Sequence, residues 1–306
     1  MIIASDLTKR YGRKTAVEDV SFSVETGKVT GFLGPNGAGK STTMRLMLGL
    51  DSGNGQTTFD DKPLYSYTVP ARMVGILLEA KAFHPTRTAR NHLRVLAAAG
   101  GIEESRVDEA LDTVGLQDVA DKRPGKFSLG MAQRLGIAAA ILGEPKYLML
   151  DEPANGLDPE GIAWLREFLK DYADKGNGVF VSSHLLSEMA QMADNVVVIG
   201  KGKLITSTSV GALLAGNGHG TVFVRSSNMR KLEGVLRAKL LDYKRVDGGI
   251  QVEGATTDDI GKLAHEAGLP VLELSRQDAS LEQAFLDITA SAQEYQAHGD
   301  QKGEGK

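Results

Sequence analysis

Residues 34–42 read GPNGAGKST and fit the pattern G-x-x-x-x-G-K-[S/T]. The apolar run Val29–Leu33 comes directly before them, and Met44, Met47 and Leu48 follow at helical spacing. The stretch therefore predicts a strand, a glycine-rich loop and a helix, in that order. A glycine-rich turn is common before helices, but such a turn does not require Gly-Lys-Ser at its end.

This loop has the chemistry of a polyphosphate site. Its glycines allow positive φ and a close approach of the backbone, so that consecutive N–H groups point at the phosphates, above the positive end of the following helix. Lys40 adds a charge for the β- and γ-phosphates, and the Ser41 hydroxyl is placed to ligate magnesium. We expect every residue of the loop to bind the nucleotide: Gly34, Pro35, Asn36, Gly37, Ala38, Gly39, Lys40, Ser41 and Thr42.

Composition narrows the class of protein. The chain has 306 residues, 42% of them apolar, which is enough for two domains. A net charge of −4 gives no general attraction to nucleic acid or anionic lipid, so we expect no nucleic-acid partner. The absence of cysteine excludes disulfides and thiolate metal sites and fits a cytoplasmic protein. No signal peptide or bilayer-spanning run is visible, so we expect no direct insertion into a membrane.

The first 216 residues have the pattern of an α/β nucleotide-binding domain. Residues 1–33 read as strands, and the strand-like run Met73–Leu78 ends at Glu79. A carboxylate at that end of a strand is placed to engage a metal or water. The pattern then turns helical, which predicts a helical subdomain inserted at about 82–145. Ser128 is a plausible N-cap there, and the helix that it begins is a second potential anion site.

A second apolar run ends in two acids. Tyr147–Leu150 is followed by Asp151 and Glu152. In the context of the phosphate loop, this is the pattern of the strand that holds magnesium, with Asp151 acting through the metal. Glu152 is then the general-base candidate, because an adjacent buried carboxylate can orient water toward the γ-phosphate.

Three further side chains are candidates for the same site. Tyr11 is expected on an exposed loop, where its ring is able to stack on a base. Asp158 lies in a turn after the acidic pair. His184 follows the strand-like run Val179–Ser183, where a neutral imidazole can contact a phosphate oxygen or the attacking water.

Residues 217–290 change character. Their predicted order is strand, helix, strand, strand, helix, strand, which is the ferredoxin-like α+β pattern, and Ser280 with Gln283 forms a capping box for a last helix. We interpret this region as a small accessory or regulatory domain. The tail 291–306 is rich in Gln, Gly and charge, a composition typical of disorder.

These motifs, in this order, resemble the ATP-binding cassette (ABC) transporter ATPases over roughly residues 1–205. The resemblance implies that Tyr11 stacks on adenine, that residues 34–42 are the Walker A loop, and that Asp151 and Glu152 are the Walker B pair. It also implies that Asp158 is the D-loop aspartate and His184 the switch histidine. The C-terminal extension resembles the bacitracin-resistance and multidrug export branch of the family, in which a separate membrane permease carries the substrate.

The sequence departs from the family at two places. The signature L-S-G-G-Q appears as FSLGM at 127–131, which keeps Ser128 and Gly130 but replaces a Gly and the Gln. The glutamine of the Q-loop is replaced by Glu79, which when ionised accepts hydrogen bonds only and adds a negative charge beside magnesium.

The leading hypothesis is an ATP-hydrolysing exporter subunit that uses ATP and Mg²⁺. It works as a homodimer that sandwiches ATP between Walker A and the partner's signature, at the cytoplasmic face of the membrane and bound to a permease. The alternative is a soluble ATPase of the same superfamily that acts on ribosomes or DNA. The short separation of Ser41 from Ser128 excludes the long coiled coil of DNA-clamp members, and only one cassette is present. A small-molecule kinase leaves the signature helix and Glu152 unexplained.

Overall fold

The structure is a computed structural model, and it describes residues 1–183, 186–216, 221–277 and 285. Contacts divide these residues into two compact units, one of residues 1–209 and one within residues 210–287. The sequence predicts a domain boundary after residue 216. The division by contacts instead falls before helix α7 (Val210–Gly216).

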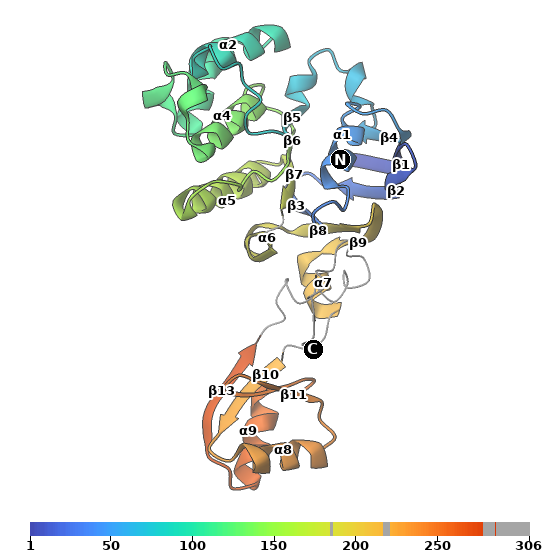
Figure 1. The fold of residues 1–306 in the computed structure, drawn as a ribbon, viewed down its shortest axis with the longest axis vertical. Helices are drawn as coiled ribbons and strands as arrows, with labels where there is room; N and C mark the ends of the chain where they lie inside the picture. Colours follow the sequence, from blue (N-terminus) through green and yellow to red (C-terminus); the bar gives the residue numbers. More distant parts are fainter. Residues whose placement is uncertain (184–185, 217–220, 278–284, 286–306) are drawn as a thin grey trace, which may run out of the picture. The chain divides into compact units, whose positions relative to one another are not determined.

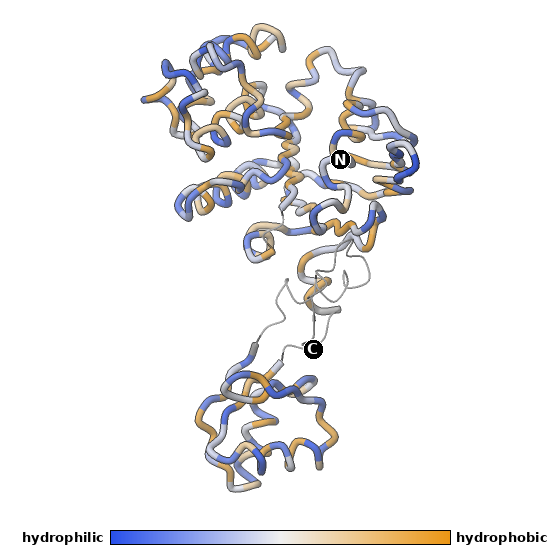
Figure 2. Tube along the Cα trace, viewed as in Figure 1, coloured by the Kyte–Doolittle hydropathy of each residue, from blue (hydrophilic) through white to orange (hydrophobic). Residues whose placement is uncertain are grey.

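A six-stranded sheet is the centre of the first unit (Figure 1). Its strands run in the order β5-β6-β7-β3-β8-β9, and all neighbours pair in parallel except β8 with β9. In chain order the bounds are β3 (Lys28–Leu33), β5 (Val74–Leu77), β6 (Tyr147–Leu150), β7 (Gly178–Ser183), β8 (Asn195–Gly200) and β9 (Lys203–Ser209). The inner strands are apolar runs buried on both faces, as in parallel sheets covered on each side. Figure 2 shows the hydrophobic residues of these strands down the middle of the unit.

A three-stranded antiparallel sheet, β2-β1-β4, packs beside it. Its strands are β1 (Ile2–Tyr11), β2 (Lys14–Val24) and β4 (Asn54–Phe59). Val20, Phe22 and Val24 alternate with exposed residues along β2, so one face of this strand turns into the core. The ring of Phe22 lies 5.7 Å from that of Phe32 and 5.4 Å from that of Phe180, which joins the small sheet to β3 and β7.

Helices flank the central sheet on both sides (Figure 1). Helix α1 follows the glycine-rich loop, while α5 contacts β3 and β7. The predicted inserted subdomain contains α2, α3 and α4. The bounds are α1 (Lys40–Met47), α2 (Ala89–Gly100), α3 (Ser105–Thr113), α4 (Leu129–Ile141), α5 (Pro159–Asp174) and α6 (Leu186–Met192), with short 3₁₀ turns at Leu64–Ser66, Pro70–Arg72, Gln117–Val119 and Pro124–Lys126.

The second unit has the predicted ferredoxin-like fold. Its antiparallel sheet has the order β11-β12-β10-β13, and α8 and α9 pack on the face that carries Val222, Val224, Ile250 and Val252. The bounds are β10 (Thr221–Ser226), α8 (Met229–Ala238), β11 (Tyr243–Val246), β12 (Gly249–Val252), α9 (Thr257–Glu266) and β13 (Val271–Gln277). The predicted capping box at Ser280 and the tail 291–306 lie outside the described residues.

Candidate nucleotide-binding and catalytic site

The candidate residues gather because parallel strands end at one edge of the central sheet. The glycine-rich loop follows β3, Asp151 and Glu152 follow β6, and Glu79 follows β5. In open α/β sheets this carboxyl edge is where ligands bind. His184, directly after β7, lies outside the described residues.

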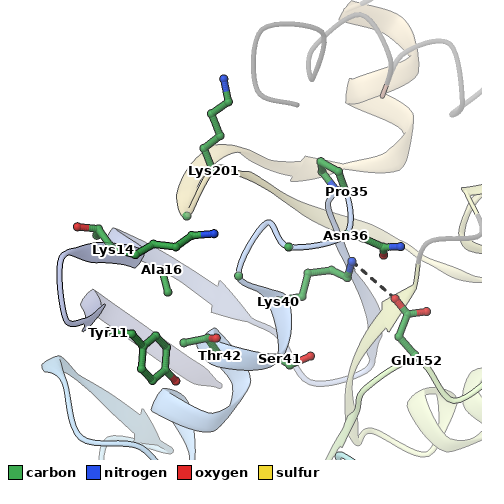
Figure 3. Close-up of a pocket in the computed structure, with 14 residues that line it drawn as sticks. Tyr11, Lys14, Ala16, Pro35, Asn36, Lys40, Ser41, Thr42, Glu152 and Lys201 are labelled. Carbon is green, nitrogen blue, oxygen red and sulfur yellow. Dashed lines mark ion pairs between the residues drawn. The ribbon is translucent and has the colours of Figure 1, made fainter. Parts of the chain in front are cut away.

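A cavity of about 650 Å³ opens over the loop (Figure 3). Among the predicted residues, its lining includes Tyr11, Glu152 and Pro35, Asn36, Gly37, Gly39, Lys40, Ser41 and Thr42. The first turn of α1 has no side-chain cap, because Gly39 stands at its N-cap in a left-handed conformation. The amide groups of this turn are therefore available to an anion, as the loop pattern predicts.

Lys40 lies inside this cavity and is only 7% exposed. Its Nζ donates a hydrogen bond of 2.7 Å to the carbonyl oxygen of Gly34 and lies 3.6 Å from Oε1 of Glu152 (Figure 3). The ammonium group thus bridges the loop and the candidate base. A negatively charged phosphate that enters here meets the Lys40 ammonium and competes with the Glu152 carboxylate for it.

Tyr11 is 51% exposed but does not lie in a loop, which corrects the prediction. It is the last residue of β1, where it pairs with Lys14 across a two-residue hairpin turn. Its hydroxyl donates to Asp51, and the Arg45 guanidinium holds the pKa of that carboxyl below its usual value. Nζ of Lys9 lies 4.9 Å from the ring centroid. These contacts fix the ring at the cavity edge, where it is available for stacking on a base.

The acidic pair is held by the neighbouring strand. The buried Ser182 hydroxyl, on β7, donates to Oδ1 of Asp151 and accepts the backbone N–H of Glu152 at 2.8 Å. Glu152 has φ of +49°, a left-handed conformation that side chains other than glycine adopt at a cost of about 1–3 kcal/mol. Such strain is typical of functional positions.

Seven of the predicted residues that the structure describes do not line the cavity: Gly34, Ala38, Glu79, Ser128, Gly130, Asp151 and Asp158. Ser128 and Gly130 lie at the start of α4, Asp158 caps α5 by accepting the N–H of Gly161 at 2.9 Å, and Glu79 lines a separate cavity with Leu135 and Gly136 of α4. The structure of one chain therefore does not bring the signature residues to its own phosphate loop.

Two lysines in the cavity lining were missed by sequence reasoning. Lys14 comes from β2 and Lys201 from the turn between β8 and β9, beside Gly202. Figure 3 shows the Lys14 ammonium directed toward the loop. Neither lies in a motif, and their place depends on contacts between distant strands, so a local pattern carried no signal for them.

Comparison with known proteins decides the family. The ABC transporter model matches residues 17–155. The bacitracin transport ATP-binding protein BcrA of Bacillus licheniformis is 38% identical to this chain over 94% of the chain and 97% of the relative. The chain belongs to the ABC transporter ATP-binding subunits. As a member, it is an ATPase that binds nucleotide.

Two more relatives extend the comparison. The lantibiotic transport ATP-binding protein SrtF of Streptococcus pyogenes is 40% identical over 67% of this ABC subunit and 89% of the relative. A solved structure of an ATP-binding subunit of an ABC transporter is 25% identical, with a TM-score of 0.63, and covers 86% of this chain and 99% of its own. The model of a domain of unknown function matches residues 220–282, within the second unit.

No described helix of this ABC subunit has both the length and the hydrophobicity to cross a membrane.

One residue of the altered signature of this ABC subunit packs against the turn that follows the acidic pair. Leu129, which replaces a glycine of the family pattern, lies against Gly156, at φ +78° in the turn after the acidic pair. A Cβ atom at Gly156 would lie 2.3 Å from Cδ2 of Leu129. The signature helix of this ABC subunit therefore packs on that turn through a side chain.

The residues present suit magnesium. Mg²⁺ prefers hard oxygen ligands and takes one or two carboxylates together with substrate phosphates and waters. Ser41 on α1 and Asp151 after β6 offer a hydroxyl and a carboxylate. Within the described residues, no group of three or more His, Cys, Asp or Glu side chains forms a metal site.

Proposed function

We propose that this chain powers a membrane exporter of antibiotic-like compounds, at the cytoplasmic face of the membrane and bound to a separate permease. The similarity to a bacitracin transport ATP-binding protein supports this, because it runs through both units and not through the ATPase motifs alone. The lantibiotic transport relative, whose match covers 67% of the chain, supports the same class of cargo. Specificity for the cargo lies in the permease.

The hydrolytic mechanism starts from the ion pair of Lys40 with Glu152. When the γ-phosphate of ATP enters, it takes the Lys40 ammonium as its partner, and the Glu152 carboxylate is released to accept a hydrogen bond from water. Glu152 then orients this water in line with the γ-phosphate and takes its proton. Ser41 and Asp151 would hold Mg²⁺, which would supply positive charge to the phosphates.

The observation that carries this proposal is the distance of 3.6 Å between the Lys40 and Glu152 side chains in the cavity over the loop. Lys40 begins α1 and Glu152 follows β6, and the fold brings these two distant residues to one place. Tyr11 holds the adenine at the far edge of the cavity. Ser128 and Gly130, with Asp158, complete the site from a second copy of the chain, because they do not line the cavity of their own chain.

The test is Glu152→Gln. This change keeps the size of the side chain and removes its basicity, so ATP binding should persist while hydrolysis falls by about 10²- to 10⁴-fold. Blocked hydrolysis should trap a dimer with ATP and not with ADP, because the γ-phosphate joins the two halves. Size-exclusion chromatography with each nucleotide measures this, together with a phosphate-release assay.

Glu167→Gln, at an exposed glutamate of α5, is the matched control and should behave as the wild type. A Glu152→Gln variant that hydrolyses ATP at the wild-type rate would refute the assignment of the base. A variant that stays monomeric with bound ATP would refute the sandwich for the isolated subunit. Co-purification of a tagged chain with a hydrophobic membrane protein tests the permease.

A further inference from the structure

The backbone of Glu152 is held in an unfavourable conformation. Its φ of +49° lies in the left-handed region, and Pro153 follows it, although a residue before proline prefers extended backbone. A carboxylate on such a residue points in a direction that an ordinary strand end would not give it. Something in the surroundings must therefore hold both peptide groups of Glu152.

Ser182 holds the first of these groups. Its side chain is fully buried at the end of β7, and its hydroxyl accepts the N–H of Glu152 at 2.8 Å while it donates to Oδ1 of Asp151. A single hydroxyl therefore sets the relative position of the two acids. Replacement by alanine would leave both the N–H and the carboxylate without this partner.

Gln133 holds the second group. Its side chain is 2% exposed, and Nε2 donates a hydrogen bond of 3.1 Å to the carbonyl oxygen of Glu152. Gln133 belongs to α4, the helix that begins at Ser128. The helix that carries the signature is thus hydrogen-bonded to the main chain of the candidate base.

We propose that Ser182 and Gln133 are positioning residues that together keep Glu152 in its left-handed conformation, and that Gln133 transmits movements of the signature helix to the Glu152 carboxylate. The inference rests on the proposed role of Glu152 as the base. It explains why two polar side chains are buried at this place. A shift of α4 on nucleotide binding moves Gln133 and, through its hydrogen bond, the carbonyl group of Glu152. The orientation of the Glu152 carboxylate then changes as well.

The test compares Gln133→Met, which keeps the length of the side chain without its donor, with Ser182→Ala. Each should lower kcat for ATP by about 10- to 100-fold, since misplacement of a catalytic group by about 1 Å costs that much, while the Kd for a fluorescent ATP analogue stays unchanged. Ser182→Ala should also raise the Mg²⁺ concentration needed for half-maximal rate, through Asp151. Ser226→Ala, which removes a buried hydroxyl bonded to the Pro270 carbonyl in the second unit, is the control and should keep the wild-type rate.

Combination with Glu152→Gln separates the inference from the proposed function. Because Gln133 acts only through Glu152, Gln133→Met added to Glu152→Gln should cause no further loss of rate. If Glu152→Gln alone keeps the wild-type rate, the proposed function is wrong. If Glu152→Gln is slow but folded Gln133→Met and Ser182→Ala keep the wild-type kcat, only the inference is overturned. Thermal unfolding checks folding, and if one variant does not fold, the other decides.

Discussion

The N-termini of α1 and α4 differ in whether a side chain caps their free amide groups. Helix α1 begins at Gly39 with no side-chain cap, while α4 begins at Ser128, whose hydroxyl accepts the N–H of Met131 at 3.1 Å. The first helix leaves its amides open to phosphate, and the second satisfies one of its amides within the chain. From this difference we infer that one half of the nucleotide site, at α1, is ready in a single chain, whereas under the proposed function the other half, at α4, waits for a second copy of the chain.

Lys40→Ala disrupts the half of the site at α1 and has the largest expected effect on ATP binding. The backbone cradle remains, but the γ-phosphate loses its fixed cation and faces the Glu152 carboxylate. Loss of one partner of a buried charge pair costs about 2 kcal/mol or more, so ATP should bind at least about 30-fold more weakly. Titration with labelled ATP measures this. Unchanged affinity would remove the basis for the phosphate-loop assignment.

Ser128→Arg disrupts the half of the site at α4, which a second copy of the chain supplies under the proposed function. Added to Glu152→Gln, it should prevent the ATP-dependent dimer by placing a bulky side chain where the partner's phosphate must sit. ATP affinity of the monomer should not change, because Ser128 does not line the cavity of its own chain. Sizing and labelled-ATP titration on the same sample separate these effects. A dimer that persists with ATP would contradict the sandwich.

Glu79→Ala tests a residue that belongs to neither half. Glu79 lines a cavity of about 330 Å³ that it shares with residues of α4, apart from the phosphate pocket. We expect ATP binding to be unaffected and hydrolysis in the presence of the permease to fall by less than about tenfold, well below the loss for a general base. Wild-type turnover in that assay would show that Glu79 takes no part.

Asp60→Asn is expected to leave both halves active and to change stability alone. Partial burial would raise the pKa of Asp60, but hydrogen bonds from Lys146 at 2.6 Å, the Met1 ammonium at 2.7 Å and Tyr147 at 2.7 Å outweigh burial and hold the pKa well below its usual value. The variant should lose about 1–2 kcal/mol of unfolding free energy at pH 7, measured in urea.

The pH dependence of this loss follows from the sign of the shift. A carboxyl whose folded-state pKa is lowered stabilises the fold above its unfolded-state pKa, which is about 3.9. The difference between wild type and Asp60→Asn should therefore be complete above about pH 5 and shrink as the pH falls below about 4. A constant difference down to pH 3 would contradict the charge interaction.

The phosphate loop and the acidic pair could be predicted from sequence because each lies in one short segment. The ferredoxin-like order of the second unit was also predicted, since hydrophobic period and turn residues are local signals. The same reasoning placed Tyr11 in a loop, whereas Tyr11 is the last residue of β1 and pairs with Lys14 across the hairpin. The contacts of Ser182 and Gln133 with Glu152 could not be predicted, because each acts on the backbone of a residue far along the chain.

The contact between Leu129 and Gly156 sets a rule for anyone who builds hybrid cassettes. Because a Cβ atom at Gly156 would meet the leucine side chain, the signature of this protein and the turn after Glu152 form a matched pair. A signature transplanted alone into a relative with a larger residue at the position of Gly156 would push its own helix away from the catalytic turn. The two segments must be moved together, as a single interchangeable part.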